Sequence, residues 1–237
     1  MTSRVAALLL GGAIALGLVA MGFVVGKAAI GVKQLDRVVT VKGLSEREVP
    51  ANVVIWPIQF VEVANDLPTL YAVLEGNVGN IRQFLLDRGI SEAEITNERP
   101  LIIDKTAQQY GGGPRPEFRY SANQTVTVYS EKIEIVRKLM GEMSELGKQG
   151  IVFSGDYYQS QTEYLFTGLN EIKPAMVEEA TREARAVAEK FAADSDSVLG
   201  KIRTASQGQF SITERDKNNP HIKKVRVVST IEYYLSD

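Results

Sequence analysis

The longest uninterrupted apolar segment of the chain runs from Val5 to Gly26, with no charged residue between Arg4 and Lys27. As a helix rising about 1.5 Å per residue, it would span roughly 33 Å, enough to cross the ~30 Å hydrocarbon core of a bilayer. A cleaved signal peptide is the alternative, but its apolar region is usually about 7–15 residues long and ends at small residues. The best cleavage junction here, 26–28, contains Lys27. The pattern therefore predicts a retained transmembrane helix.

Basic residues flank this segment on both sides. Only Arg4 and the terminal amine precede it, whereas Lys27, Lys33, Arg37 and Lys42 follow it. The positive-inside rule would place the longer C-terminal part in the cytoplasm, but large domains cross a membrane with little regard to a few flanking charges. Charge alone therefore leaves the orientation open.

Alternation of apolar and polar residues and runs of β-branched residues predict seven strands in the rest of the chain. They lie at 38–41, 53–64, 95–109, 119–129, 151–166, 202–212 and 225–235. Apolar residues spaced by three and four predict helices, which lie at 66–89, 130–147 and 168–197. Pro57 lies inside the second strand, which indicates an edge strand or a bulge because proline cannot donate a ladder hydrogen bond. A turn is expected at 43–48.

In two of these elements the spacing defines the face that should be buried. In the strand at 119–129 this face consists of Tyr120, Ala122, Val126 and Val128. In the helix at 168–197 it consists of Ala180, Ala184, Val187, Ala188 and Phe191. Charged pairs at four-residue spacing lie on the opposite side of that helix, where water is expected.

The order of elements predicts an α+β fold. Two strand–helix–strand units with mostly antiparallel sheets are followed by a long helix and a terminal hairpin. The expected organisation is an N-terminal tail at 1–4, a transmembrane anchor at 5–26, a linker at 27–37 and one domain at 38–237. A subdivision of that domain near 111–117 stays open.

Composition narrows the partners and the chemistry. Hydrophobic residues make up 44% of the chain and charged residues 24%, which is typical of a folded protein. The net charge of −2 argues against nucleic acid as a partner, because phosphate binding needs a basic surface. The chain contains no cysteine, which excludes disulfides, thiolate nucleophiles and cysteine-ligated metals.

The single histidine, His221, limits the catalytic sites that the chain can build. A serine–histidine–acid site would depend on it, yet it lies in a polar turn, and a zinc site needs three or four ligands. Asp194–Asp196 lacks the ligand spacing of a calcium loop, and the glycines at 111–113 lack the lysine and hydroxyl residue of a phosphate loop. We therefore expect no catalytic, cofactor-binding or metal-binding residue, and no bound cofactor.

Five tyrosines in strand-like segments are candidates for contacts: Tyr157, Tyr158, Tyr164, Tyr233 and Tyr234. Neighbouring residues of a strand point to opposite faces of the sheet. One member of each adjacent pair can therefore join the core, while the other is exposed or packs on a neighbour. Core packing, a subunit interface and ligand stacking stay open as roles, in that order of preference.

Short motifs in a fixed order run along the chain. In the first half they are Val38–Gly43, Glu46, Glu48–Pro50 and Leu85–Ile90. In the second half they are Tyr120–Ala122, Val126–Val128, Gly150–Ile151, the alanines Ala180, Ala184, Ala188 and Ala192, and Leu199–Ile202. With the order of elements, they resemble the SIMPL-domain family of bacterial envelope proteins over about residues 38–237. One departure is Pro50–Asn52, because many relatives carry an acidic residue directly after the proline.

The resemblance implies an extracytoplasmic domain, self-assembly into rings or cages, and a loose link to envelope and oxidative stress, without a known catalytic activity. We therefore expect a non-enzymatic homo-oligomer of the bacterial inner membrane. It would span the bilayer once through residues 5–26 and place its C-terminal domain in the periplasm. The alternative is a periplasmic module that binds a lipid or a small apolar ligand between sheet and helices, and an enzyme ranks third.

Overall fold

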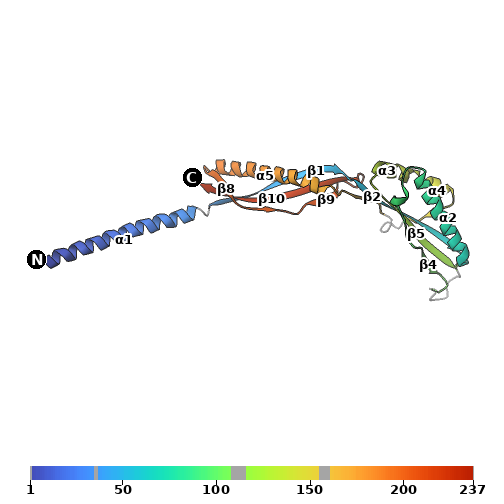
Figure 1. Ribbon diagram of the computed structural model, residues 1–237, viewed down its shortest axis with the longest axis horizontal. Helices are drawn as coiled ribbons and strands as arrows, with labels where there is room; N and C mark the ends of the chain where they lie inside the picture. The colour runs from blue at the N-terminus through green and yellow to red at the C-terminus, as the bar shows by residue number, and fades with distance from the viewer. Residues whose placement is uncertain (1, 35–36, 108–115, 155–160, 237) are drawn as a thin grey trace. The chain divides into compact units, whose positions relative to one another are not determined.

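The computed structural model describes residues 2–34, 37–107, 116–154 and 161–236, which fold as an α+β protein (Figure 1). An apolar N-terminal helix precedes antiparallel sheets, a long helix and a C-terminal hairpin, as the sequence predicts. The chain divides into two compact units, each assembled from separate segments. Unit 1 contains residues 1–46, 172–211 and 226–237, and unit 2 contains residues 47–171 and 212–225.

The apolar segment lies in α1 (Thr2–Gln34). The helix therefore continues beyond 5–26 into the part that was expected to be a linker, because residues 28–32 are again apolar and contain no helix breaker stronger than Gly31. Within α1, Leu10–Ala28 is long and apolar enough to cross a membrane, and none of it is buried. A signal sequence near the N-terminus can meet the same criteria of length and apolarity.

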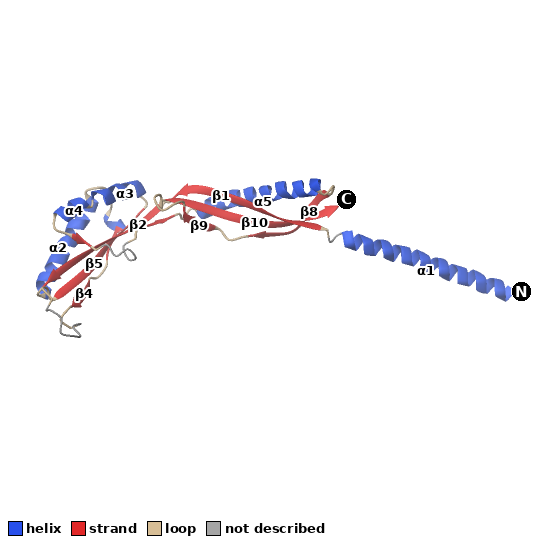
Figure 2. Cartoon of the chain, turned by 180° about the vertical axis from the view of Figure 1, so that it is seen from behind, coloured by secondary structure: helices blue, strands red, loops and turns tan. Residues whose placement is uncertain are grey.

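Unit 1 is built from a sheet and one long helix. Its strands are β1 (Val38–Pro50), β8 (Val198–Gln207) and most of β10 (Ile222–Ser236), and its helix is α5 (Leu169–Asp194). A further strand, β9 (Ser211–Glu214), falls mostly within residues 212–225 of unit 2. The strand order is β1-β10-β8, with β9 also paired to β10, and β8 runs antiparallel to β10. α5 lies along one face of this sheet (Figure 2).

The contact between α5 and β1 leaves no room for a side chain at Gly43. A Cβ atom there would lie 1.8 Å from the carbonyl oxygen of Ala180 and 2.5 Å from the backbone nitrogen of Ala184. The turn predicted at 43–48 is therefore wrong. The glycine serves a close approach of strand and helix, and β1 continues through it to Pro50.

The buried stripe of α5 consists of small residues and one methionine: Met176, Ala180, Ala184, Ala188 and Ala192. The alanines at 180, 184 and 188 agree with the prediction, but Val187 and Phe191 are 38% and 55% exposed. Those two assignments are wrong because the close backbone approach at Gly43 selects the face with the smallest side chains rather than the most apolar one.

Unit 2 contains, among its described residues, a six-stranded sheet covered by helices. Its strands are β2 (Val53–Ala64), β3 (Ile95–Asn97), β4 (Leu101–Asp104), β5 (Tyr120–Ser130), β6 (Val152–Phe153) and β7 (Glu163–Leu165). Its helices are α2 (Leu67–Leu86), the 3-10 helix η1 (Glu92–Glu94), α3 (Ile133–Glu142) and α4 (Ser144–Lys148). The pairing of β2 with β5 is antiparallel and unbroken from Val54 opposite Ser130 to Ala64 opposite Tyr120.

Pro57 lies in the centre of this sheet rather than at an edge. On one side β2 pairs with β5, where Pro57 is opposite Thr127. On the other side β7 pairs with Val53–Ile55 and β6 with Phe60–Val61, so Pro57 falls in the gap between the two. The predicted edge position is wrong because two short strands share that side of β2, and neither pairs with the proline.

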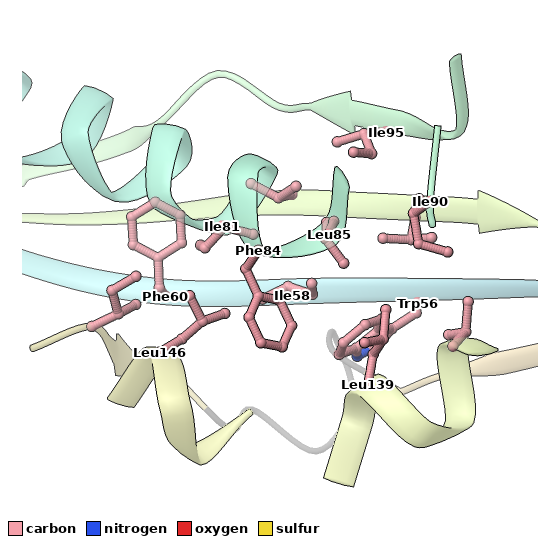
Figure 3. Close-up of a cluster of buried hydrophobic side chains, with 14 of the residues drawn as sticks. Trp56, Ile58, Phe60, Ile81, Phe84, Leu85, Ile90, Ile95, Leu139 and Leu146 are labelled. Carbon is pink, nitrogen blue, oxygen red and sulfur yellow. The ribbon is translucent and has the colours of Figure 1, made fainter. Parts of the chain in front are cut away.

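The two faces of β2 and β5 have different surroundings. Even-numbered residues are buried, namely Val54, Trp56, Ile58, Phe60, Ala122, Val126 and Val128. They pack against α2, α3 and α4, where Ile81, Leu85, Leu139 and Leu146 lie over them (Figure 3). The alternation predicted for 119–129 is confirmed for three of its four residues, and Tyr120 is half-buried against the same cluster.

Candidate functional site

His221 lies in the turn before β10 and is half-buried. Its carbonyl oxygen accepts a hydrogen bond of 2.8 Å from the Ala51 nitrogen, and its ring packs edge-on against Tyr164 with 6.0 Å between ring centroids. Burial lowers the pKa of the imidazole and favours its neutral form. Among the described residues, none donates to or accepts a hydrogen bond from the ring, so the geometry is that of a packed turn residue.

Asp194–Asp196 closes the C-terminal end of α5. The Ser197 nitrogen donates to the Ala192 carbonyl at 2.9 Å, and the Asp196 nitrogen donates to the Ala193 carbonyl at 3.2 Å. Asp196 has a positive φ of 52°, so the three features form a Schellman motif, with an aspartate where glycine is usual. Within the described ranges, no group of three or more histidine, aspartate or glutamate residues is placed to hold a metal ion.

Glu94 is a highly connected carboxylate of unit 2. It accepts hydrogen bonds from the Ser130 hydroxyl at 2.6 Å, the Ser91 nitrogen at 2.7 Å, the Ser91 hydroxyl at 2.7 Å and Lys132 Nζ at 2.9 Å. Burial would raise the pKa of Glu94, but these hydrogen bonds outweigh it and lower the pKa to about 2. The carboxylate therefore joins η1 to the end of β5 and the start of α3, which is a structural role.

Lys223 is buried at 7% exposure and lies in a groove of about 540 Å³ beside β7. Its Nζ donates a hydrogen bond of 3.4 Å to Glu214 Oε1. Glu163 and Phe166 also line the groove. Because the groove is open and carries charges of both signs, it is not complementary to a lipid tail or another apolar ligand.

Sequence reasoning missed Lys223, although the alternation of β10 contains the signal. Residues 223, 225, 227, 229, 231 and 233 alternate with more exposed neighbours, and all six are buried. A lysine at the start of this series continues the buried face by position. The strand predicted from the sequence begins at 225, because the adjacent charges of Lys223 and Lys224 are typical of the polar turn before it.

The candidate tyrosines occupy different environments. Tyr233 is 3% exposed and belongs to the core between α5 and the sheet, whereas its neighbour Tyr234 is half-buried, with Arg203 over its ring at 5.9 Å. Tyr164 is 8% exposed in the core of unit 2. The expected split of an adjacent pair is therefore confirmed at 233–234. Tyr157 and Tyr158, like the glycines at 111–113, lie outside the described residues.

A comparison with curated proteins gave no match. A family model does match: that of SIMPL, described as a protein of unknown function (DUF541), over residues 39–229. The match begins within β1 and ends within β10, so it includes both units and leaves out α1. It covers most of the chain and agrees with the resemblance of the sequence motifs. This chain therefore belongs to the SIMPL family.

Proposed function

We propose that this protein is a non-enzymatic envelope protein of the bacterial inner membrane, with α1 as its anchor, its SIMPL domain in the periplasm, and copies that associate with one another. The observation that carries the proposal is the Leu10–Ala28 segment, none of which is buried within the described chain. Moving one exposed Leu, Val or Phe side chain out of water is favourable by about 1.5–3 kcal/mol. A segment of this length therefore favours a bilayer over water.

An open strand supports the association of copies. β8 pairs with β10 on one side, and no other described strand pairs with it. Nine of its ten residues are exposed. An edge strand presents unpaired backbone groups that a second chain can bind, and an anchor that confines copies to one plane raises their effective concentration.

Cysteine labelling tests the anchoring and the orientation directly, because the chain has no native cysteine. Ala186→Cys places a thiol on the exposed side of α5, and Ser3→Cys places one before the apolar segment. A membrane-impermeant maleimide should label Ala186→Cys in intact spheroplasts, and Ser3→Cys only after detergent is added. The reverse pattern would refute the periplasmic placement. Protein that is released from membranes and begins near Ala29 would refute the retained anchor.

The alternative function, binding of a lipid or small apolar ligand, has weaker support. The groove beside Lys223 carries charges, and a second groove of about 430 Å³ is lined by Glu131, Lys132, Glu134 and His221 together with apolar residues. A co-purified lipid at one molecule per chain, found by mass spectrometry of the protein in mild detergent, would favour this alternative over the proposed function.

A further inference from the structure

Two amide side chains interrupt the apolar, helix-facing side of the unit 2 sheet. Gln124 lies in β5 opposite Phe60 of β2, and Asn97 lies at the end of β3 opposite Val126 of β5. Residues directly opposite each other in antiparallel strands share a face. Because Phe60 and Val126 are buried beneath the helices, both amides lie on that side of the sheet. The register therefore places two polar groups where apolar residues would continue the core.

A pocket of about 320 Å³ lies between these amides and α2. The helix lines it with Tyr71, Leu74, Glu75 and Val78, whose spacing places them on one side of α2. Leu74 is fully buried and forms an apolar floor, whereas Tyr71 is 46% exposed and leaves its ring accessible. The sheet side adds the two amides and Pro100. The pocket therefore combines an apolar floor, an aromatic ring and a polar rim, as small-molecule sites do.

Hydrogen bonds hold both walls of the pocket in place. The Glu98 nitrogen, in the loop after β3, donates to the Thr125 carbonyl at 3.0 Å, and Gln124 Nε2 donates to the Glu98 carbonyl at 2.9 Å. On the helix side, Asn77 Nδ2 donates to Glu62 Oε1 at 2.7 Å, which ties α2 to β2. The pocket is therefore formed in advance, so a ligand has little ordering to impose when it binds.

The polar groups of the rim keep free hydrogen-bonding capacity. Within the described ranges, neither the Glu75 carboxylate nor the Asn97 amide hydrogen bonds to another group, whereas the nearby Glu62 and Asn77 bond to each other. Gln124 uses its nitrogen to hold the loop, which leaves its oxygen as an acceptor. Acceptor lone pairs outnumber free N–H groups in this set, because a carboxylate carries acceptors only. The rim therefore selects a ligand rich in hydrogen-bond donors.

Charge narrows the ligand further. Of the charged residues that the structure describes, Glu75 lines the pocket, and the exposed Glu98 and Arg99 of the adjoining loop do not. A carboxylate at the rim repels anions, and an apolar chain would leave the rim groups unpaired. A cation could pair with Glu75, but a single exposed ion pair contributes little and leaves the amides unused. A neutral ligand with several hydroxyl groups fits best.

We propose that this pocket binds one neutral sugar ring. Its hydroxyl groups donate to Glu75 and the two amides, and its C–H face packs on Tyr71 and the apolar floor. A pocket near the lower end of the size range of small-molecule sites holds one ring, and few contacts limit the Kd to about 1 mM. The site lies within unit 2 and does not depend on the association of copies put forward above.

Saturation-transfer NMR of the full chain tests the proposal. The protein is held in phosphatidylcholine nanodiscs, because detergents with sugar head groups would compete for the site. Glucose, galactose and N-acetylglucosamine are the probes, and the diamine putrescine represents the cationic alternative. At least one sugar should give a saturable signal with a Kd of about 1 mM. Added salt should leave this Kd unchanged, because the ligand carries no charge to be screened.

Two variants locate the binding site. Tyr71→Ala removes the ring that the sugar packs on, and Asn97→Ala removes an amide of the rim, so each should raise the Kd at least tenfold. Tyr129→Ala and Asn80→Ala are the matched controls, since both residues are exposed and neither lines the pocket, and they should leave the Kd unchanged. The single tryptophan, Trp56, reports by fluorescence that unit 2 is folded in every variant.

Three results would overturn the proposal. The first is that none of the three sugars binds at up to about 50 mM, far above the expected Kd. The second is that a sugar binds but the Tyr71 and Asn97 variants bind it as well as the unchanged chain, which would place the ligand elsewhere. The third is that putrescine alone binds and that salt weakens its binding, which would make the pocket a cation site. None of these results bears on whether copies associate.

Discussion

Unit 2 and unit 1 hold helices against a sheet by different means. The core of unit 2 contains 21 buried residues, with large side chains such as Trp56, Phe60 and Leu139 filling the space between layers. Among the described residues, the buried cluster between α5 and the sheet of unit 1 contains five, two of which are the alanines Ala184 and Ala188. In unit 1, β1 and α5 approach so closely at Gly43 that no side chain fits between their backbones.

This difference implies opposite sensitivities to mutation. A core filled by large side chains loses stability when a side chain is shortened, because a cavity remains. A contact between backbones loses stability when a side chain is added, because neither backbone can move without breaking its own hydrogen bonds. The four predictions below test this contrast and the polar contacts around it.

Phe60→Ala should have the largest effect. Phe60 is fully buried in unit 2, and removal of a buried phenylalanine ring costs about 3–5 kcal/mol. Phe191→Ala is the control of the same chemical type, since Phe191 is 55% exposed, and it should cost less than about 1 kcal/mol. Urea unfolding followed by Trp56 fluorescence measures the first loss, and hydrogen exchange of α5 peptides measures the second, because Phe191 lies in unit 1. Equal losses would contradict the assignment of Phe191 to the surface.

Gly43→Ala should destabilise unit 1 by about 3 kcal/mol, at the upper end for overpacking, because the added Cβ meets backbone atoms. Gly79→Ala in α2 is the matched control. A Cβ there meets nothing within 4 Å, so the helix should gain about 0.5–1 kcal/mol. Hydrogen exchange of α5 peptides reports on unit 1, and Trp56 fluorescence reports on unit 2. A loss seen equally by both probes would show that the two units unfold together.

Glu94→Gln should cost about 2 kcal/mol, since it weakens hydrogen bonds to a charged acceptor. The pKa of Glu94 is lowered from 4.5 to about 2 by folding. Its contribution is therefore complete above pH 4.5 and is lost as the pH falls toward 2. Urea unfolding at pH 7 and pH 3 measures this, and the difference between the two chains should shrink at pH 3. A difference that is independent of pH would refute the charge-assisted role.

His221→Ala should have the smallest effect, below about 1 kcal/mol, because the ring is half-buried and makes one edge-on aromatic contact with Tyr164. Burial lowers the pKa of His221, so the unfolded chain takes up the proton first as the pH falls below 6.5, and the folded chain loses stability there. Thermal unfolding at pH 7.5 and pH 5.5 should show this loss in the unchanged chain and less of it in the variant.

Local sequence patterns correctly predicted the helices and strands whose positions depend on residues nearby in the chain. The alternation at 120–128 is confirmed at Ala122, Val126 and Val128. The helix start predicted at 66 is also confirmed, and the Asp66 side chain caps α2 by accepting from the Thr69 nitrogen at 2.9 Å. The predictions that were wrong, at Pro57 and Phe191, depend on contacts with residues far away in the chain. Pro57 is tolerated centrally because of where β6 and β7 pair, and Phe191 is exposed because of a glycine in β1.

Only some of the candidate functional residues could be predicted from the sequence. The apolar run of α1 is plain in the sequence, whereas the buried position of Lys223 appears only once β10 is seen to begin at Ile222. The absence of charge at 120–130 is also plain in the sequence. Only the strand register shows that Glu98 of the neighbouring segment lies across from Thr125, because its nitrogen donates to the Thr125 carbonyl at 3.0 Å.

The position of β10 has a consequence for biosynthesis. β10 lies between β1 and β8, yet it follows every other strand of unit 1 in the chain. During synthesis, β1 therefore waits without its partner β10 while residues 47–171, the larger part of unit 2, emerge and can collapse. Completion of unit 1 then requires pairing across nearly the whole length of the domain, which is intrinsically slow. Until β10 has been synthesised, the backbone groups of β1 that will pair with it stay open to other chains.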